Sequence, residues 1–78
     1  MKDQILSYIS EKLLKGESEI TYDTALYSSG IMKSMTHLKL INYLERTYDI
    51  SVEMNKIRIE NFNTVNMITD YVQSQVPA

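Results

Sequence analysis

Apolar residues recur at helical spacing in three stretches of the chain. In the first stretch, four of them fall within one arc of about 100° on a helical wheel: Ile5, Leu6, Ile9 and Leu13. This stripe predicts an amphipathic helix that begins at Asp3, as its cap, and runs to about Lys15. Gly16 then supplies a stop signal.

The second helix is predicted from Ser34 to Tyr48. Its core-facing stripe follows a 3-3-4 spacing through Leu38, Ile41, Leu44 and Tyr48. Asp49 and Ser51 end this helix, and we expect Ile50 and Val52 to turn inward after it.

The last helix is predicted to start at Asn63 or Thr64, which are both favoured cap residues. Its apolar face carries Val65, Ile68 and Val72, with Met67 and Tyr71 flanking them. A short helical turn is also expected between residues 54 and 60. That stretch is ambiguous, because Ile57 and Ile59 alternate as they would in a strand.

Residues 16–30 show no helical period and hold the only two glycines, Gly16 and Gly30, at their ends. We expect a long ordered loop, pinned by Ile20, Leu26 and Tyr27. Loops of about 15 residues are unusual in a compact domain and are more often functional or disordered than idle. The predicted fold is therefore all-α: a small helical bundle of three main helices and one short helix, with a long first loop.

The composition is that of a globular protein of one domain, residues 1–78. Its 44% hydrophobic and 23% charged residues are close to ordinary usage, so the chain is expected to fold unaided as a monomer. The polar tail, residues 74–78, contains the lone proline and is expected to fray. The chain has no cysteine, which excludes disulfides and thiolate metal sites and fits a reducing, cytoplasmic location.

Several function classes are disfavoured. A net charge of −2 argues against nucleic-acid binding, and the long loop argues against a helix-turn-helix. No apolar run reaches the roughly 18–20 residues of a membrane span, and the mixed charge of the N-terminus does not fit a signal peptide. The single histidine, His37, has no evident nucleophile partner, and neither a phosphate loop nor a metal-ligand motif is present. We therefore expect neither a metal site nor an enzyme.

The segment from Leu26 to Ile50 carries the chemistry of interest, because it delivers Ser34 to the first turn of a helix directly after the long loop. It resembles the acyl, peptidyl and aminoacyl carrier proteins, whose signature is an apolar-aromatic pair, a Ser-Gly-like turn and then Asp-Ser-Leu. The corresponding residues here are Leu26-Tyr27, Ser29-Gly30-Ile31-Met32 and Lys33-Ser34-Met35. The stretch from Glu60 to Val65 is similar to that family's entry into the last helix, so the resemblance covers nearly the whole chain.

The resemblance implies that a phosphopantetheinyl transferase, using Mg²⁺, moves 4′-phosphopantetheine from coenzyme A onto Ser34. The arm ends in a thiol that holds an acyl or aminoacyl group as a thioester, which supplies thiol chemistry to a chain without cysteine. The implied protein is a free-standing carrier, no enzyme itself, that shuttles its cargo from a loading enzyme to downstream biosynthetic enzymes in a specialised pathway. The cargo stays open between fatty acyl, polyketide and amino acid; the Ser34-Met35 pair also occurs in D-alanyl carriers.

Two other interpretations of Ser34 compete with its role as an attachment residue. It could serve only as a helix N-cap, or the fold could be a helical protein-interaction module with Ser34 unmodified. Lys33 keeps the second reading open, because it replaces the aspartate that precedes the serine in the family and reverses the charge where transferases dock.

The second helix is unusually basic for this family. From Lys33 to Arg46, three basic residues face one acid, Glu45, which gives a local charge of +2. Such charges can be a solvated face, but they also predict a dedicated set of partners. The candidate partner contacts are Met32, Lys33, Met35, His37, Lys39 and Arg46. For Met32 and the other methionines, core packing is the competing role; for His37, it is packing or simple surface exposure.

Overall fold

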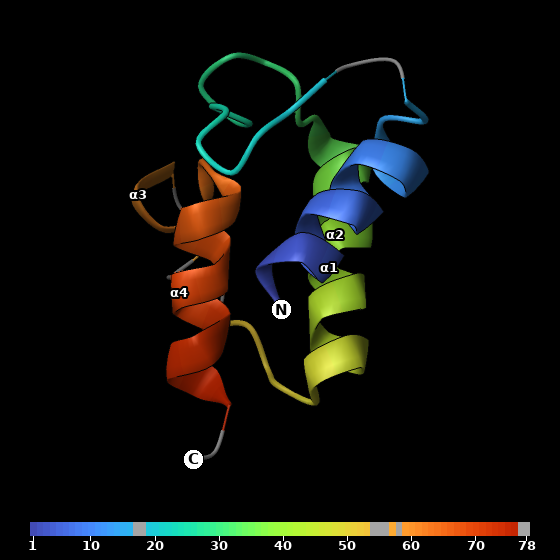
Figure 1. Cartoon of the computed structure of the whole chain (residues 1–78). Helices are drawn as coiled ribbons and strands as arrows, with labels where there is room; N and C mark the ends of the chain where they lie inside the picture. The colour runs from blue at the N-terminus through green and yellow to red at the C-terminus, as the bar shows by residue number, and fades with distance from the viewer. Residues whose placement is uncertain (17–18, 54–56, 58, 77–78) are drawn as a thin grey trace.

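Five helical segments follow one another along the chain in a computed structural model that describes residues 1–16, 19–53, 57 and 59–76 (Figure 1). They are α1 (Lys2–Ser7), the π-helix η1 (Tyr8–Leu13), α2 (Ser34–Tyr48), α3 (Ile59–Phe62) and α4 (Val65–Gln75). Within these residues no strand occurs, and the predicted all-α bundle with a long first loop is confirmed. Part of the ambiguous stretch, residues 54–56 and 58, lies outside the described residues.

The first predicted helix is present, but its two halves have different geometry. It begins at Lys2 with Met1 as N-cap, so the expectation that Asp3 caps it is wrong. After Ser7 the helix widens, and its end shows a bond from the Leu14 N–H to the Ile9 carbonyl five residues back, at 2.9 Å. Its predicted stripe is correct: Ile5 and Ile9 are fully buried, and Leu6 and Leu13 pack against the core.

Helix α2 has the predicted bounds, Ser34 to Tyr48, but part of its predicted core face is wrong. Leu44 is fully buried and Ile41 is partly buried, whereas Leu38 is 59% exposed and Leu40 takes a core position instead. A step of three residues turns about 300°, which is about 60° short of a full turn. The two steps from Leu38 through Ile41 to Leu44 therefore add up to a displacement of about 120° around the helix. Leu38 and Leu44 therefore lie on different faces.

The first helix runs against α2 and links it to α4. Figure 1 shows α2 and α4 both descending in the view, while the first helix rises in front of α2. Its α1 half packs on α4 and its η1 half packs on α2. The Tyr8 and Tyr43 rings stack with centroids 3.8 Å apart, and the Tyr48 hydroxyl donates to the Gln4 side chain at 2.8 Å. The core is formed by Ile5, Ile9, Leu26, Met32, Leu40, Leu44, Val52, Phe62, Val65, Ile68, Tyr71 and Val72.

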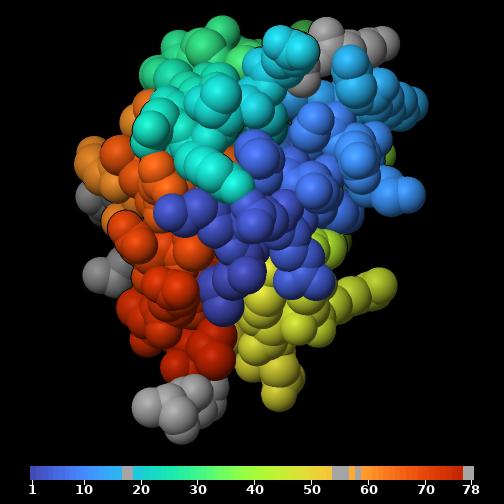
Figure 2. Space-filling view, viewed as in Figure 1, coloured from blue at the N-terminus to red at the C-terminus, as the bar shows by residue number. Residues whose placement is uncertain are grey.

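The long loop covers the end of the bundle at which α2 and α4 begin. Figure 2 shows its surface over the upper parts of the first helix and α4. As expected, the loop is pinned by Leu26, which is fully buried, and by Ile20 and Tyr27, which pack against the core. The inward turn after α2 is also confirmed, because Val52 is buried and Ile50 partly so.

Helix α4 starts where the sequence predicts. Thr64 is its N-cap, and the Thr64 hydroxyl accepts a hydrogen bond from the Met67 N–H at 3.1 Å. The helix continues to Gln75, two residues into the tail expected to fray; Pro77 and Ala78 lie outside the described residues. No helix in the part of the chain that the structure describes is both long and apolar enough to cross a bilayer.

The two leucines of α2 provide a matched test of this core. Leu44→Ala is expected to lower the free energy of unfolding by about 2–5 kcal/mol, because it removes a fully buried side chain and leaves a cavity. Leu38→Ala, on the same helix, should change it by no more than about 0.5 kcal/mol. Urea unfolding followed by circular dichroism measures both. Equal losses in the two variants would contradict the orientation of α2.

Candidate functional site

A tight turn brings the chain from the loop into α2. The Gly30 N–H donates to the Tyr27 carbonyl at 3.1 Å, and the Met32 N–H donates to the Leu26 carbonyl at 2.9 Å. Gly30 adopts a φ of +83°, a left-handed conformation that glycine takes without strain. Met32 is then buried, with 7% of its surface exposed, and Lys33 extends directly into the helix.

Ser34 is the first residue of α2, and the N-cap is Lys33. The competing interpretation of Ser34 as the cap itself is therefore wrong. Ser34 is exposed, and its hydroxyl makes no hydrogen bond to another described residue. Its location leaves this hydroxyl open to an external enzyme.

The beginning of α2 carries no side-chain cap, in contrast to α4. The first backbone bond of α2 runs from the His37 N–H to the Lys33 carbonyl at 2.7 Å, so the N–H groups of residues 34–36 precede it. Unpaired N–H groups and the positive end of the helix dipole favour a negative group here. Lys33, the residue directly before Ser34, adds a positive charge to this end of α2.

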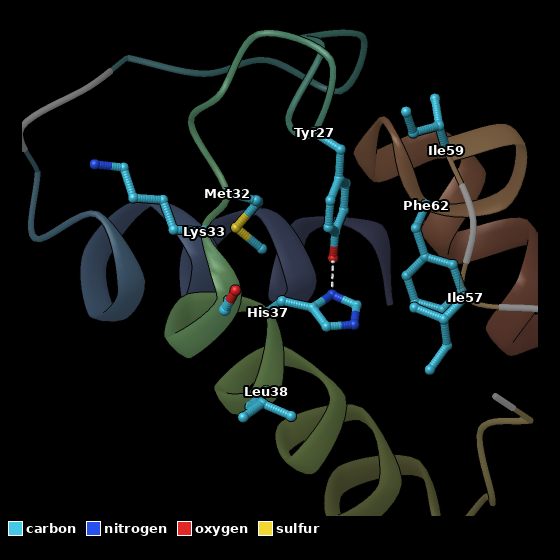
Figure 3. A pocket seen from close by; sticks show the side chains of 9 residues that line it. Tyr27, Met32, Lys33, His37, Leu38, Ile57, Ile59 and Phe62 are labelled. Atoms are coloured by element: carbon cyan, nitrogen blue, oxygen red, sulfur yellow. Dashed lines mark hydrogen bonds between the residues drawn. The ribbon is translucent and has the colours of Figure 1, made fainter.

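A cavity of about 580 Å³ opens beside Ser34, between α2, the loop, Ile57 and α3 (Figure 3). Its apolar walls are Met32, Leu38, Ile57, Ile59 and Phe62, and its polar lining is Tyr27, Lys33, Ser34 and His37. In the described part of the chain, no cluster of three or more acidic or histidine side chains is arranged to hold a metal ion.

Tyr27 and His37 form a hydrogen-bonded pair within this cavity, drawn as the dashed line in Figure 3. Burial raises the pKa of the Tyr27 phenol, which keeps it protonated. Burial also lowers the pKa of His37, which favours the neutral ring. We therefore assign the Tyr27 hydroxyl as donor to Nδ1 of His37, with the second ring nitrogen directed toward the apolar wall.

Asn63 fixes the loop and was missed as a site residue by the sequence reasoning. Its side-chain oxygen accepts from the N–H groups of Tyr27 and Ser28, at 2.9 and 3.0 Å. Its backbone carbonyl accepts from the Leu26 N–H at 2.6 Å, and its amide nitrogen donates to the Ser28 hydroxyl at 3.2 Å. In the sequence, Asn63 was identified only as a possible helix cap next to Thr64. No local pattern predicts its contact with a loop residue 35 positions earlier in the chain.

The predicted site residues divide into two groups. Met32, Lys33, Ser34 and His37 meet at the cavity. Met32 is buried in the wall of the cavity, which favours its competing role in core packing; its contact with a docking enzyme stays a prediction. Met35, Lys39 and Arg46 lie instead on the outer side of α2, where Met35 is 71% exposed.

Comparison with known proteins finds matches over most of the chain. A profile of the family described as "Phosphopantetheine attachment site" matches residues 3–72. A D-alanyl carrier protein of Lactobacillus delbrueckii is 32% identical over 73 residues, which cover 94% of this chain and 90% of the length of that relative. One from Lactococcus lactis is 35% identical over 75 residues, covering 96% and 95%. An acyl carrier protein of Exiguobacterium sibiricum is 34% identical over 79 residues, covering 96% and 98%.

The role of Asn63 can be tested at the loop itself. Asn63→Ala should speed hydrogen exchange of the Tyr27 and Ser28 amides and destabilise the fold by about 1–3 kcal/mol, because it removes the acceptor of both N–H groups. Asn63→Asp keeps that acceptor and should protect both amides far better. Unchanged exchange in Asn63→Ala would show that other contacts hold the loop.

Proposed function

The chain belongs to the family of phosphopantetheine-attachment domains, and on that premise we propose that Ser34 is its attachment residue. The observation that carries this proposal is the position of Ser34. It is an exposed serine at the uncapped start of α2, next to an apolar cavity. Members of the family hold their cargo on covalently attached 4′-phosphopantetheine, so the protein is a carrier.

The residues around Ser34 fit a phosphodiester. The serine oxygen is free to form the new ester bond, and the unpaired N–H groups at the start of α2 favour the negative charge next to it. Lys33 also favours a phosphate at this end of α2, because its ammonium is positively charged. The attached arm supplies a terminal thiol on which cargo is held as a thioester.

The chain's own part in the chemistry is to position the Ser34 hydroxyl for the transferase. Among the residues that the structure describes, none forms a hydrogen bond with the Ser34 hydroxyl, and the histidine of the cavity, His37, uses its Nδ1 as acceptor for Tyr27. Activation of the hydroxyl therefore falls to the transferase, with its Mg²⁺. We propose on these grounds that the chain catalyses no reaction by itself.

The cargo we propose is D-alanine. Its support is the name of two relatives, the D-alanyl carrier proteins at 32% and 35% identity. A D-alanyl thioester carries an ammonium group, which is costly to bury in an apolar cavity, so this cargo would stay in water. The cavity beside Ser34 favours a second candidate, an acyl chain, since its walls are mostly apolar. The acyl carrier protein at 34% identity supports that alternative.

The partners we propose are a phosphopantetheinyl transferase, a loading enzyme and the enzymes that receive the cargo. Carrier proteins in general work with the first two. Met35 and Leu38, both well exposed next to Ser34, offer an apolar contact for any of them, while Lys33, Lys39 and Arg46 favour a dedicated set with acidic surfaces. His37 would meet such a partner only through the cavity.

The cytoplasm is the compartment we propose, because the chain has no cysteine to oxidise.

Modification of Ser34 is tested by intact mass after incubation with coenzyme A and a promiscuous transferase. The wild-type chain should gain the mass of one phosphopantetheinyl group, and Ser34→Ala should gain none. The modified chain is then offered D-alanine or octanoate with matching adenylating enzymes, and we expect D-alanine to be loaded.

Each outcome of that experiment decides one point. No mass gain with any competent transferase would overturn the attachment proposal and leave an interaction module with an unmodified serine. Normal modification followed by loading of octanoate alone would retain the attachment site and replace the cargo.

Lys33 is expected to hinder a general-purpose transferase. Lys33→Asp restores the charge found in the family at this position and should raise the initial rate of modification about tenfold. Lys2→Asp makes the same change of net charge at the far end of the first helix and serves as the control. A rate that is unchanged or lower in Lys33→Asp would show that this lysine is no obstacle.

A further inference from the structure

A second concave surface lies between the first helix and α2, apart from the cavity at Ser34. We call it the basic groove; it has a volume of about 310 Å³ and is lined by Tyr8, Lys39, Asn42, Tyr43, Arg46 and Thr47. Five of these six come from one side of α2, where residues three and four positions apart are neighbours on the helix surface. None of them lines the cavity at Ser34, so the basic groove is a separate feature of the molecule.

The aromatic part of the basic groove is held in place. Tyr8 and Tyr43 stack with their planes 10° apart, and the Tyr8 hydroxyl donates to the Lys39 carbonyl at 3.4 Å. Tyr43 is also in edge contact with Tyr48, whose centroid lies 6.4 Å away. The two stacked rings thus present a fixed apolar surface to whatever enters.

The charge of the basic groove is uncompensated. Lys39 and Arg46 are exposed, and neither forms an ion pair within the residues that the structure describes. Glu45, which precedes Arg46 in the chain, is engaged elsewhere, because its carboxylate accepts the Val52 N–H at 2.9 Å. The two cations stand seven residues apart on α2, about 10 Å along its axis, with Asn42 between them.

We propose that the basic groove docks an acidic amphipathic helix of a partner protein. Two carboxylates at a seven-residue spacing on that helix would face Lys39 and Arg46, and an apolar side chain between them would lie on the Tyr8–Tyr43 stack. The inference rests on the proposed function for the kind of partner, an enzyme that loads or unloads the carrier. It names the chemistry by which that enzyme is recognised.

Charge and shape favour a protein helix over the other anionic surfaces. Binding to an anionic membrane typically uses clusters of about four to eight basic residues, whereas the basic groove has two. The surface is also concave, and a bilayer would not fill it. Nucleic acid is opposed by the net charge of −2.

The probe is a synthetic peptide of about 15 residues, long enough to form some helix in water. It carries two glutamates at positions i and i+7 and a leucine at i+4, and a second peptide carries lysines in their place. Each is titrated into the Ser34→Ala chain, which cannot be modified at that position, while amide chemical shifts are recorded. We expect saturable binding of the glutamate peptide, with shifts centred on residues 39–47, that weakens as salt is raised.

The double variant Lys39→Glu/Arg46→Glu should lose affinity for the glutamate peptide about tenfold or more, because it exchanges two attractions for two repulsions. Lys2→Glu/Lys15→Glu makes the same change of net charge at exposed residues outside the basic groove and should bind nearly as the parent does.

Three results would overturn the proposal: no binding, equal loss in both double variants, or equal binding of the lysine peptide. Binding to phosphatidylglycerol vesicles by this face, with none to the glutamate peptide, would replace it with a membrane contact. All these measurements use a chain without Ser34, so their failure stays distinct from a failure of the attachment proposal.

Discussion

The fold of this chain around its site depends on the attachment of the first loop to the junction between α3 and α4. Leu26 is fully buried, and its N–H donates to the Asn63 carbonyl, while the Asn63 side chain accepts the two N–H groups that follow. The same loop is held to α4 a little earlier, where the Asn66 N–H donates to the Tyr22 carbonyl at 3.1 Å. These bonds satisfy backbone groups of Tyr22, Leu26, Tyr27 and Ser28, so this part of the loop is held to α4 and to Asn63 without helical structure of its own. The position of this part of the loop decides where α2 begins and therefore where Ser34 stands.

Helix α2 divides its surface among three roles, and each follows from which side chains its faces carry. One face buries Leu40 and Leu44 in the core. The start of the helix is left uncapped and presents Ser34, so it suits a negatively charged substituent. The outer face carries exposed apolar residues near Ser34 and positive charge further along. One helix thus contributes to the core and also carries both the proposed attachment point and the proposed partner contacts.

The cavity beside Ser34 combines an apolar wall with one well-defined polar pair. Burial moves the pKa of Tyr27 upward and that of His37 downward, and both shifts favour the uncharged forms. A neutral pair avoids placing an isolated charge in an apolar cavity, which would be unfavourable. Since Nδ1 of His37 accepts the hydrogen bond of Tyr27, that nitrogen is not free to act as a base.

The sequence by itself determined the elements that depend on local chemistry. The bounds of α2, the Thr64 cap of α4, the stripe of the first helix and the buried anchors of the loop follow from helical periodicity, capping and the placement of glycine. The family, and the proposal that Ser34 is its attachment residue, also came from a local motif in a recognisable order of elements. Only the tertiary structure decided which face of α2 is buried, because Leu38 and Leu40 are equally apolar and the packing of neighbouring helices selects between them. The tertiary structure likewise decided the role of Asn63 and the pairing of Tyr27 with His37, because these contacts join groups that are not neighbours in the sequence. It also decided where the cavity at Ser34 and the basic groove lie, because both form between packed segments.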